Sequence, residues 1–405
     1  MALDESTLAA LREDAARELP RTVALRHALH AVPETGLDLP RTQELVLEAL
    51  ADLDLEVTTG SALSSVTAVL RGARPGPAVL LRGDMDALPV TEASGEPFTS
   101  QHEGVMHACG HDLHVAGLVA AARILAARRE EIAGSVVLMF QPGEEGDHGA
   151  RLMIEEGVLD AAGSRAVAAY GVHVMAAQVP LGAVASRPGT FMAASDTVHV
   201  TVHGRGGHGS KPQLALDPVP VAAHIVLALQ TMVTREVDAF DPVVVTVGRI
   251  EAGTKDNVIP DDALLEATVR TFSAATHAAM PERITRVCEH VAAAHGMTVT
   301  VDYERGYPVT VNDAAEVDRA HRLTSGLFGE AAWIDAPVPV AGAEDFSYVL
   351  EEVPGAYVFV GATPAGEDPL TAAYNHSPRA RFDDDALLTG PAVLAVLALD
   401  RLSEG

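Results

Sequence analysis

The sequence predicts an α/β catalytic domain interrupted by an inserted ferredoxin-like domain. Two observations lead to this fold class. In the outer parts of the chain, short apolar runs bounded by Gly or Asp alternate with helical patterns, which is typical of a sheet covered by helices on both faces. In the middle, six elements follow in the order β-α-β-β-α-β. We therefore expect a discontinuous domain, 1–186 and 307–405, around an inserted domain at 187–306.

The outer domain begins with an amphipathic pattern over Met1–Pro20, which predicts a surface helix. Apolar runs of strand length and periodic helical segments follow it along the chain. The expected strands are Val66–Leu70, Ala78–Leu81, Ser135–Phe140, Ala166–Tyr170 and Ala356–Gly361, and the expected helices are His114–Glu130, Ala314–Phe328 and Asp384–Leu402.

The inserted domain has strands that alternate between apolar and polar residues and helices with one apolar face. A glycine-rich loop, Gly204–Pro212, follows its first strand. The expected elements are, in order, strand Asp196–His203, helix Pro220–Arg235, strands Val243–Ile250 and Ala263–Phe272, helix Pro281–His295 and strand Thr298–Glu304.

Composition limits the partners of the protein. The formal net charge of −28 repels nucleic acid and anionic membrane surfaces, so neither is an expected partner. No segment has the roughly 18 uninterrupted apolar residues of a membrane-spanning helix. Of only two Cys, Cys288 lies at helical spacing with Ile284 and Val291, as in a buried stripe. Few Cys and no signal sequence predict a reducing, cytoplasmic location.

One short segment, Met106–His114, contains three His, one Asp and Cys109. Thiolate and imidazole bind borderline-soft divalent metals, so this segment is a candidate metal site. Cys109 could instead be a nucleophile beside His111 or His114, as in thiol hydrolases. Four further segments carry metal-type residues where strands are expected to end, and open α/β sheets collect ligands at that edge. They are Leu80–Asp86, Phe140–Gly146, Tyr170–His173 and Tyr374–Ser377.

These motifs resemble those of the dinuclear-metal amidohydrolases, a family of metallopeptidase type that includes hippurate hydrolase and the indoleacetyl-amino-acid hydrolases and is related to aminoacylase and carboxypeptidase G. The resemblance implies the phosphorylase/hydrolase-like fold of zinc exopeptidases, with the insert as a lid or dimerisation domain. The matching motifs run in order over almost the whole chain: Leu29–Glu34, Arg82–Pro89, Met106–His114, Gln141–Gly146, Gly206–Pro212, Gly253–Pro260, Ala343–Phe346 and Asn375–Ser377.

The resemblance implies two divalent metal ions per subunit and a general base. Glu144, next to a ligand position, would be the base that activates water. Cys and His ligands favour zinc by their softness, although manganese, cobalt or nickel would also fit this family. The implied metal ligands are Cys109, His111, Glu145, His173 and His376.

Other polar residues near these motifs are expected to support the ligands. Asp86 is expected to orient a ligand imidazole, and Asp112 and His114 are expected beside the ligands without touching metal. His107 is expected to be part of the scaffold.

The resemblance also assigns roles within the insert. His208 would stabilise the oxyanion, and in dimeric members this His comes from the partner subunit. Asn257 and Arg270 match positions that hold the substrate's free carboxylate, although Arg270 could simply be a surface charge. The loop departs from the usual pattern at Gly209 and Lys211, where Ala and Met are commoner.

Taken together, the sequence predicts a cytoplasmic, metal-dependent amidohydrolase that cleaves the amide bond of an N-acyl amino acid. We expect a homodimer, or a tetramer. A carboxypeptidase or dipeptidase of the same fold is the alternative within enzymes. A non-catalytic binding protein would not need the base Glu144 beside Glu145. The acyl group stays open, because acetyl, benzoyl, indoleacetyl and longer chains all suit these motifs.

Overall fold

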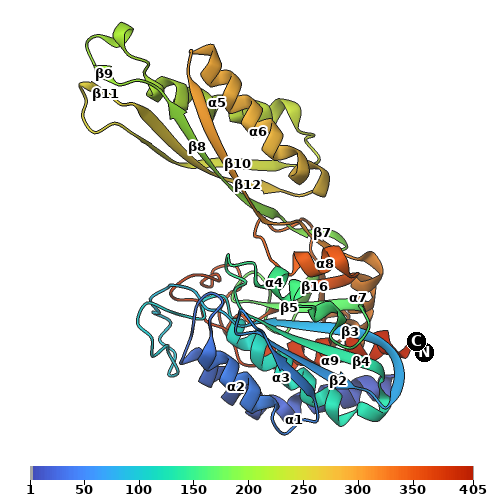
Figure 1. Ribbon diagram of the computed structural model, residues 1–405. Helices are drawn as coiled ribbons and strands as arrows, with labels where there is room; N and C mark the ends of the chain where they lie inside the picture. Colours follow the sequence, from blue (N-terminus) through green and yellow to red (C-terminus); the bar gives the residue numbers. More distant parts are fainter. Residues whose placement is uncertain (1–2, 405) are drawn as a thin grey trace. The chain divides into compact units, whose positions relative to one another are not determined.

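The computed structural model describes residues 3–404, which form two compact units (Figure 1). Unit 1 contains the chain up to Phe191, Val311–Val338 and the chain from Tyr348, whereas unit 2 contains Met192–Thr310 and Pro339–Ser347. The boundaries expected from the sequence, 186/187 and 306/307, left the second, short segment of unit 2 in the outer domain. The use of unit 2 as a lid or dimerisation domain stays a prediction.

Unit 1 is built on an eight-stranded sheet with the order β1-β2-β4-β3-β5-β16-β6-β15. The neighbours β4, β3, β5 and β16 are parallel, and β2 and β6 flank them in antiparallel orientation. Their mostly buried apolar residues are typical of strands covered on both faces. The strands are β1 (Glu56–Thr59), β2 (Val66–Arg71), β3 (Arg74–Asp84), β4 (Ala133–Gln141), β5 (Ala166–Met175), β6 (Val184–Ser186), β15 (Trp333–Asp335) and β16 (Gly355–Gly361).

Helices cover both faces of this sheet. Helices α1, α3 and α9 pack on one another beneath β3, and α4 and α8 lie on the opposite face (Figure 1). Helix α9 is apolar and long enough to cross a membrane, but 78% of it is buried inside the protein, as expected of a core helix. The helices are α1 (Glu5–His30), α2 (Pro40–Leu50), α3 (His111–Ala127), α4 (Gly149–Glu155), α7 (Ala314–Phe328), α8 (Ser347–Glu352) and α9 (Ala386–Ser403).

The predicted bounds of the first helix were wrong. The start of the predicted helix, Met1 and Ala2, lies outside the described residues. Helix α1 continues through Pro20 to His30. A proline inside a helix removes one hydrogen bond, but burial of Leu29 and the residues around it outweighs that loss.

The starts of α3 and α6 differ most from the prediction among the other helices. Helix α3 begins at His111 rather than His114, directly after Gly110. In unit 2, α6 (Ala274–Ala294) begins well before Pro281, because the Ser273 side chain accepts a hydrogen bond from the Thr276 N–H and caps the helix.

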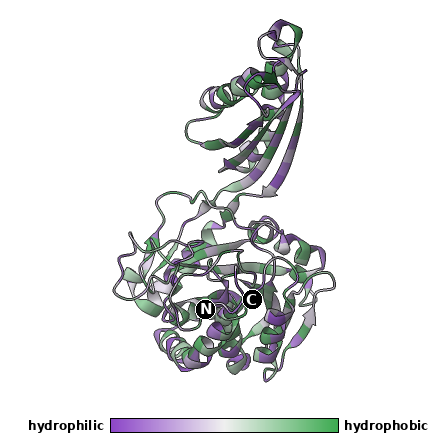
Figure 2. Ribbon diagram, turned by 90° about the vertical axis from the view of Figure 1, so that its left-hand side faces the viewer, coloured by the Kyte–Doolittle hydropathy of each residue, from purple (hydrophilic) through white to green (hydrophobic). Residues whose placement is uncertain are grey.

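Unit 2 has a four-stranded antiparallel sheet with the order β10-β12-β8-β13. Together with α5 and α6 this is the ferredoxin-like arrangement, so the predicted fold class is confirmed. Hydrophobic and hydrophilic residues alternate along its strands, which gives the sheet one apolar face (Figure 2). The elements are β8 (Ala194–His203), α5 (Pro218–Glu236), β10 (Val243–Ala252), β12 (Asp262–Thr271), α6 and β13 (Thr298–Tyr307).

Two small ladders complete the fold. Strands β9 (Gly207–His208) and β11 (Val258–Ile259) pair beyond the Asp262 end of β12. Strands β7 (Gly189–Met192) and β14 (Thr310–Asn312) pair where the chain passes between the units. These four short strands, β7, β9, β11 and β14, were not expected from the sequence.

Candidate metal centre

The carboxyl ends of β3, β4 and β5 meet at one edge of the unit 1 sheet, because these strands are parallel. Strand β3 ends at Asp84, and β4 ends at Gln141, just before the pair Glu144–Glu145. Strand β5 extends beyond the predicted Tyr170 to Met175, so His173 lies within the strand rather than after it. The sheet therefore brings acidic and imidazole side chains to the same edge.

Two loops complete this cluster. Gly110 has a φ of +88°, and a Cβ there would lie 2.5 Å from a β5 side chain, so only glycine fits between Cys109 and His111. His376 also has a left-handed backbone, with a φ of +70°. Its N–H donates to the Ala108 carbonyl at 2.8 Å, which joins the two loops.

The five side chains that were predicted as ligands lie together. Cys109 Sγ is 3.3 Å from His173 Nε2 and 3.2 Å from His376 Nε2. Glu145 Oε1 is 3.3 Å from His376 Nε2 and 3.9 Å from His111 Nε2. Their donor atoms form two groups, Cys109–His111–His173 and Cys109–Glu145–His376, each within 4.8 Å, and Cys109 belongs to both.

Two atoms of this cluster point to a bound cation. His111 Nε2 is buried and forms no hydrogen bond among residues 3–404, and Glu145 Oε1 is buried with only the long 3.3 Å contact to His376 Nε2. A buried polar atom without a partner costs about 1–3 kcal/mol, so native proteins rarely leave one unsatisfied. One thiol, three imidazoles and one carboxylate are ligands that zinc and similar divalent ions accept. The residues therefore fit a dinuclear metal centre.

The protonation states argue against a nucleophilic cysteine. Burial raises the pKa of the Cys109 thiol, and Glu145 raises it further. A nucleophilic cysteine needs the opposite shift, because the thiolate is the reactive form. The hydrogen bonds to Cys109 and Glu145 raise the pKa of His376 to about 10, whereas burial lowers the pKa of His173. A cation that binds Cys109 would displace the thiol proton, and its positive charge would stabilise the resulting thiolate.

Asp86 makes more contacts with the cluster than the predicted one to a ligand imidazole. Its two carboxylate oxygens accept the backbone N–H groups of Glu144 at 2.9 Å and Glu145 at 3.0 Å. The His111 Nδ1 atom lies 2.8 Å from the Asp86 backbone carbonyl and 3.6 Å from the carboxylate Oδ1. Asp86 thus fixes the backbone of the Glu pair with its side chain and orients the His111 imidazole mainly with its main chain.

A chain of hydrogen bonds behind the cluster fixes the proton of His173. Arg82 Nη1 donates to Asp84 at 2.6 Å, and Asp84 lies 2.5 Å from His114 Nδ1. The Val174 N–H donates to His114 Nε2, so Nδ1 of His114 carries the proton. The Val174 carbonyl in turn accepts from His173 Nδ1 at 2.8 Å. His173 Nε2 is therefore left with its lone pair toward Cys109.

Asp112 does not contact any of the five clustered side chains through its carboxylate. Its Oδ2 accepts from Arg26 Nε at 3.1 Å and lies 2.9 Å from His30 Nδ1, which anchors α1 to the start of α3. His107 is buried, and neither ring nitrogen has a partner among the described residues. Burial lowers the pKa of His107 to about 3, so it stays neutral. Sequence reasoning missed Arg26, although His30 lies in one of the matched motifs.

Glu144 lies at the edge of the cluster. Its side chain is only 6% exposed, and its carboxylate groups with His111 and Glu145 within 4.8 Å. Glu145 also belongs to the group with Cys109 and His376, which Glu144 does not join. The pair therefore offers one carboxylate for binding and one for proton transfer.

The remaining predicted site residues lie in unit 2. His208 is exposed on β9, and its Nδ1 accepts the Ser210 N–H at 3.1 Å. A neutral His208 therefore carries its proton on Nε2, which is the donor that an oxyanion contact requires. His208 pairs with Val258, and the neighbouring Gly209 N–H donates to the Asn257 carbonyl at 2.9 Å. His208 and Asn257 thus lie side by side at the small β9–β11 ladder.

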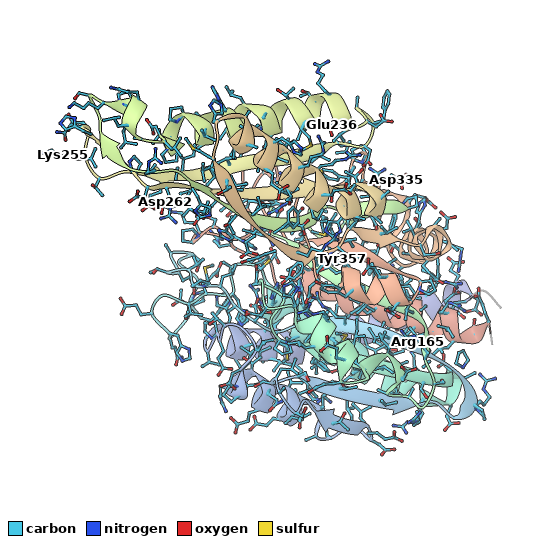
Figure 3. All side chains as sticks on the ribbon, turned by 45° about the horizontal axis from the view of Figure 1, so that its top comes forward. Arg165, Glu236, Lys255, Asp262, Asp335 and Tyr357 are labelled. Atoms are coloured by element: carbon cyan, nitrogen blue, oxygen red, sulfur yellow. The ribbon has the colours of Figure 1, made fainter. Side chains whose placement is uncertain are left out.

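Arg270 lies at the opposite end of the same unit. It is eight residues along β12 from Asp262, which is about 26 Å at 3.3 Å per residue. Figure 3 shows Lys255, in the loop before β11, at one end of the unit and Glu236, the last residue of α5, at the other. The sequence predicted that Asn257 and Arg270 both hold the substrate's carboxylate. One copy of unit 2 cannot bring both residues to the same carboxylate, because they lie at its opposite ends.

Arg270 is nevertheless available to an anion. Its guanidinium donates to Thr268 and to the Val269 carbonyl, both on its own strand, and forms no ion pair within the described part of the chain. It is half-buried, and burial lowers its pKa. A half-buried guanidinium binds a carboxylate most strongly when two parallel N–H···O hydrogen bonds join the two groups.

Known proteins resemble the chain over nearly its whole length. Residues 80–400 match the sequence profile of Peptidase family M20/M25/M40. Thermostable carboxypeptidase 2 of Saccharolobus solfataricus is 37% identical over 93% of this chain and 94% of its own length. An IAA-amino acid hydrolase of Arabidopsis thaliana (ILR1-like 2) is 37% identical over 94% and 85% of the two chains. An N-acetylcysteine deacetylase of Bacillus subtilis is 33% identical over 94% and 96%.

Two solved structures also resemble the chain over nearly its whole length. The YXEP protein of Bacillus subtilis, described as a dinuclear metal binding peptidase from M20 family, has a TM-score of 0.82 at 31% identity and covers 96% of this chain and 99% of its own. A protein of methicillin-resistant Staphylococcus aureus, described as an aminohydrolase, has a TM-score of 0.90 at 32% identity, with 97% and 99% of the two chains covered.

Proposed function

Because the chain belongs to the M20/M25/M40 peptidase family and is a hydrolase of carbon–nitrogen bonds, we propose that it cleaves the amide bond of an N-acyl amino acid. The products are a carboxylic acid and a free amino acid. The observation that carries this proposal is the buried Glu144 beside a cluster of thiol, imidazole and carboxylate groups. Two of the relatives have names that describe hydrolysis of an acylated amino acid.

We propose that the five clustered side chains hold two divalent cations. Such cations polarise the scissile carbonyl and lower the pKa of the attacking water. The thiol and imidazole groups favour zinc, whereas manganese, cobalt and nickel are the competing ions that reconstitution has to compare. The proposed ligands are Cys109, His111, Glu145, His173 and His376.

Within this site Glu144 is the proposed general base. It takes a proton from the attacking water and delivers it to the nitrogen of the leaving amine. His208 is the proposed oxyanion donor through its Nε2–H, a contribution that is typically worth about 3–4 kcal/mol. Asn257 and Arg270 are the proposed partners of the substrate's free carboxylate.

A homodimer reconciles the opposite positions of Asn257 and Arg270. Strand β10 is an edge of the unit 2 sheet, and Val244 and Ile250 on it are exposed. Antiparallel pairing of two β10 strands about a twofold axis would bring the β9–β11 ladder of one copy beside the Arg270 end of the other. We therefore propose that His208 and Asn257 act on the substrate of the second copy.

Mixing two inactive variants tests this arrangement. E144Q and H208A chains, denatured together and refolded, should recover about a quarter of the wild-type activity if His208 acts in the other copy, because half of the dimers then have one complete site. No recovery would show that both residues act within one chain. Sedimentation of the wild-type protein measures the oligomeric state independently.

A carboxypeptidase is the second candidate, favoured by the similarity to thermostable carboxypeptidase 2. The two functions differ in the group attached to the amide, which is an acyl chain in one and an aminoacyl residue in the other. Hydrolysis of matched N-acetyl, N-benzoyl and N-aminoacyl derivatives of the same amino acids by metal-reconstituted protein distinguishes them. Hydrolysis that persists after a chelator has removed all metal would contradict both.

The cellular location stays a proposal. Both cysteines, Cys109 and Cys288, are free and buried, which supports a reducing compartment such as the cytoplasm. Localisation of the tagged chain by cell fractionation tests it.

A further inference from the structure

Asn375 joins three segments of the proposed metal centre, although no role has been given to it so far. Its side chain is 9% exposed. Its Nδ2 donates to the Cys109 carbonyl at 3.1 Å and to the Val174 carbonyl at 3.0 Å. Its Oδ1 accepts the Ala176 N–H at 3.0 Å. Both amide protons and the carbonyl of this side chain are therefore engaged.

Each of these contacts lies beside a proposed ligand. The Cys109 carbonyl belongs to the ligand residue itself, and Val174 directly follows His173. Asn375 directly precedes His376. One amide side chain thus connects the three loops or strands that carry the thiol and the two imidazoles around Cys109 Sγ.

The backbone of His376 shows why this connection is needed. Its φ of +70° lies in the left-handed region, which a non-glycine residue adopts at a cost of about 1 kcal/mol or more. Such a conformation persists only where neighbouring contacts hold it. Two contacts hold His376 in this conformation. One is the hydrogen bond from its own N–H to the Ala108 carbonyl, and the other is the hydrogen bond from the side chain of the preceding residue, Asn375, to the Cys109 carbonyl.

We propose that Asn375 is a positioning residue for the metal centre, which sets the separation of Cys109, His173 and His376 before any cation binds. This inference rests on the proposed ligand set. Only an amide fits the position, because the two carbonyls require donors and the Ala176 N–H requires an acceptor. Aspartate has almost the same shape, but it would place a carboxylate oxygen against both carbonyls.

The decisive measurement is the affinity of the metal-free chain for zinc and cobalt, obtained by competition with a chromophoric chelator. The N375A variant should bind each ion about 10–100-fold more weakly than the wild type, as is usual when a group that orients metal ligands is removed. The N375D variant should lose at least as much, despite its similar size. In the cobalt-loaded protein, the thiolate-to-cobalt charge-transfer absorption should weaken or shift in both variants.

Asn312 offers a matched control in the same unit. It is 2% exposed, and its side chain donates to Ser186 Oγ and to the carbonyls of Arg187 and Tyr357, while its Oδ1 accepts the Tyr357 N–H. The N312A variant should therefore lose thermal stability as N375A does but keep the wild-type metal affinity. If N312A weakened metal binding as much as N375A, a specific positioning role would be excluded.

The outcome separates this inference from the proposed function. A wild-type protein whose cobalt spectrum lacks a thiolate band would contradict the ligand set itself. A wild-type protein with that band, together with an N375A variant of unchanged affinity and spectrum, would overturn only the role of Asn375. If the alanine chain does not fold, N375S, which keeps one donor and one acceptor, is measured against the same two results.

Discussion

Replacing Asp86 by alanine should weaken metal binding although Asp86 is not itself a proposed ligand. The carboxylate accepts two buried backbone N–H groups, at 2.9 Å from Glu144 and 3.0 Å from Glu145. Alanine leaves both donors without an acceptor, and each such loss costs about 1–3 kcal/mol, so roughly 2–6 kcal/mol of stability is at stake. Water that enters the vacated space would bring the loss toward the lower end.

The effect on metal follows from the same contacts. Without Asp86 the backbone of the Glu pair is no longer fixed, and Glu145 loses its alignment with His111 and His376. We expect the zinc affinity of D86A to fall about 10–100-fold. Urea unfolding of the chelator-treated protein measures the loss of stability, and titration of the metal-free protein measures the loss of affinity.

Asp313 provides the control for this experiment. Its carboxylate also accepts two backbone N–H groups, those of Ala315 at 2.9 Å and Glu316 at 3.1 Å, at the start of α7 in the same unit. The D313A variant should lose about 0.5–2 kcal/mol, as for other helix caps, and keep its metal affinity. A D86A protein with wild-type affinity, or a D313A protein with an equally weakened one, would refute the reasoning.

Three further predictions concern the reaction, the thiol and pH. E144Q should lower turnover about 10²–10⁴-fold with unchanged metal content by elemental analysis, since the base is lost but no ligand is; unchanged turnover would contradict its role. C109S should lower metal occupancy, whereas full occupancy with activity abolished would favour a nucleophilic thiol. Burial alone would raise the pKa of Asp196, but His277 and Tyr303 hydrogen-bond its carboxylate and hold that pKa below the ordinary value. The ionised Asp196 therefore stabilises the folded chain at pH values above the ordinary pKa of an aspartate, about 4. This stabilisation is lost as the pH falls from there through the lower pKa that Asp196 has in the folded state. Urea unfolding of wild type and D196N should show a weaker pH dependence for the variant in this range, and equal dependence would argue against the assignment.

The positions of the ligand segments followed from sequence because they depend on rules that act locally. Parallel strands end at one edge of a sheet, so the residues at the carboxyl ends of β3, β4 and β5 lie close together there. Gly110 between Cys109 and His111 also marks a sharp turn before a helix. These features are properties of short segments, and the chain order of the motifs supplied the rest.

Side-chain direction and register did not follow from sequence. The motif that contains Asp86 suggests a carboxylate near a ligand, but it does not tell that the backbone carbonyl lies closer to the imidazole than the carboxylate does. The opposite ends occupied by Arg270 and Asn257 require the register of β12, which a hydrophobic pattern does not fix. Arg26 reaches Asp112 only because α1 continues past Pro20, and that depends on tertiary packing.

The fold holds the proposed ligands in a state that is unfavourable without a cation. Cys109 is a buried thiol with a raised pKa, His111 Nε2 forms no hydrogen bond among the residues described, Glu145 Oε1 has only a long contact to His376, and His376 has a left-handed backbone. Each feature costs free energy in the metal-free chain, and a cation relieves the first three. The core of α9 and the parallel strands must therefore supply stability that the centre itself does not. Because the ligands are already ordered, metal binding costs little conformational entropy. Asp86 and Asn375 contribute to metal affinity through this ordering and not as additional ligands.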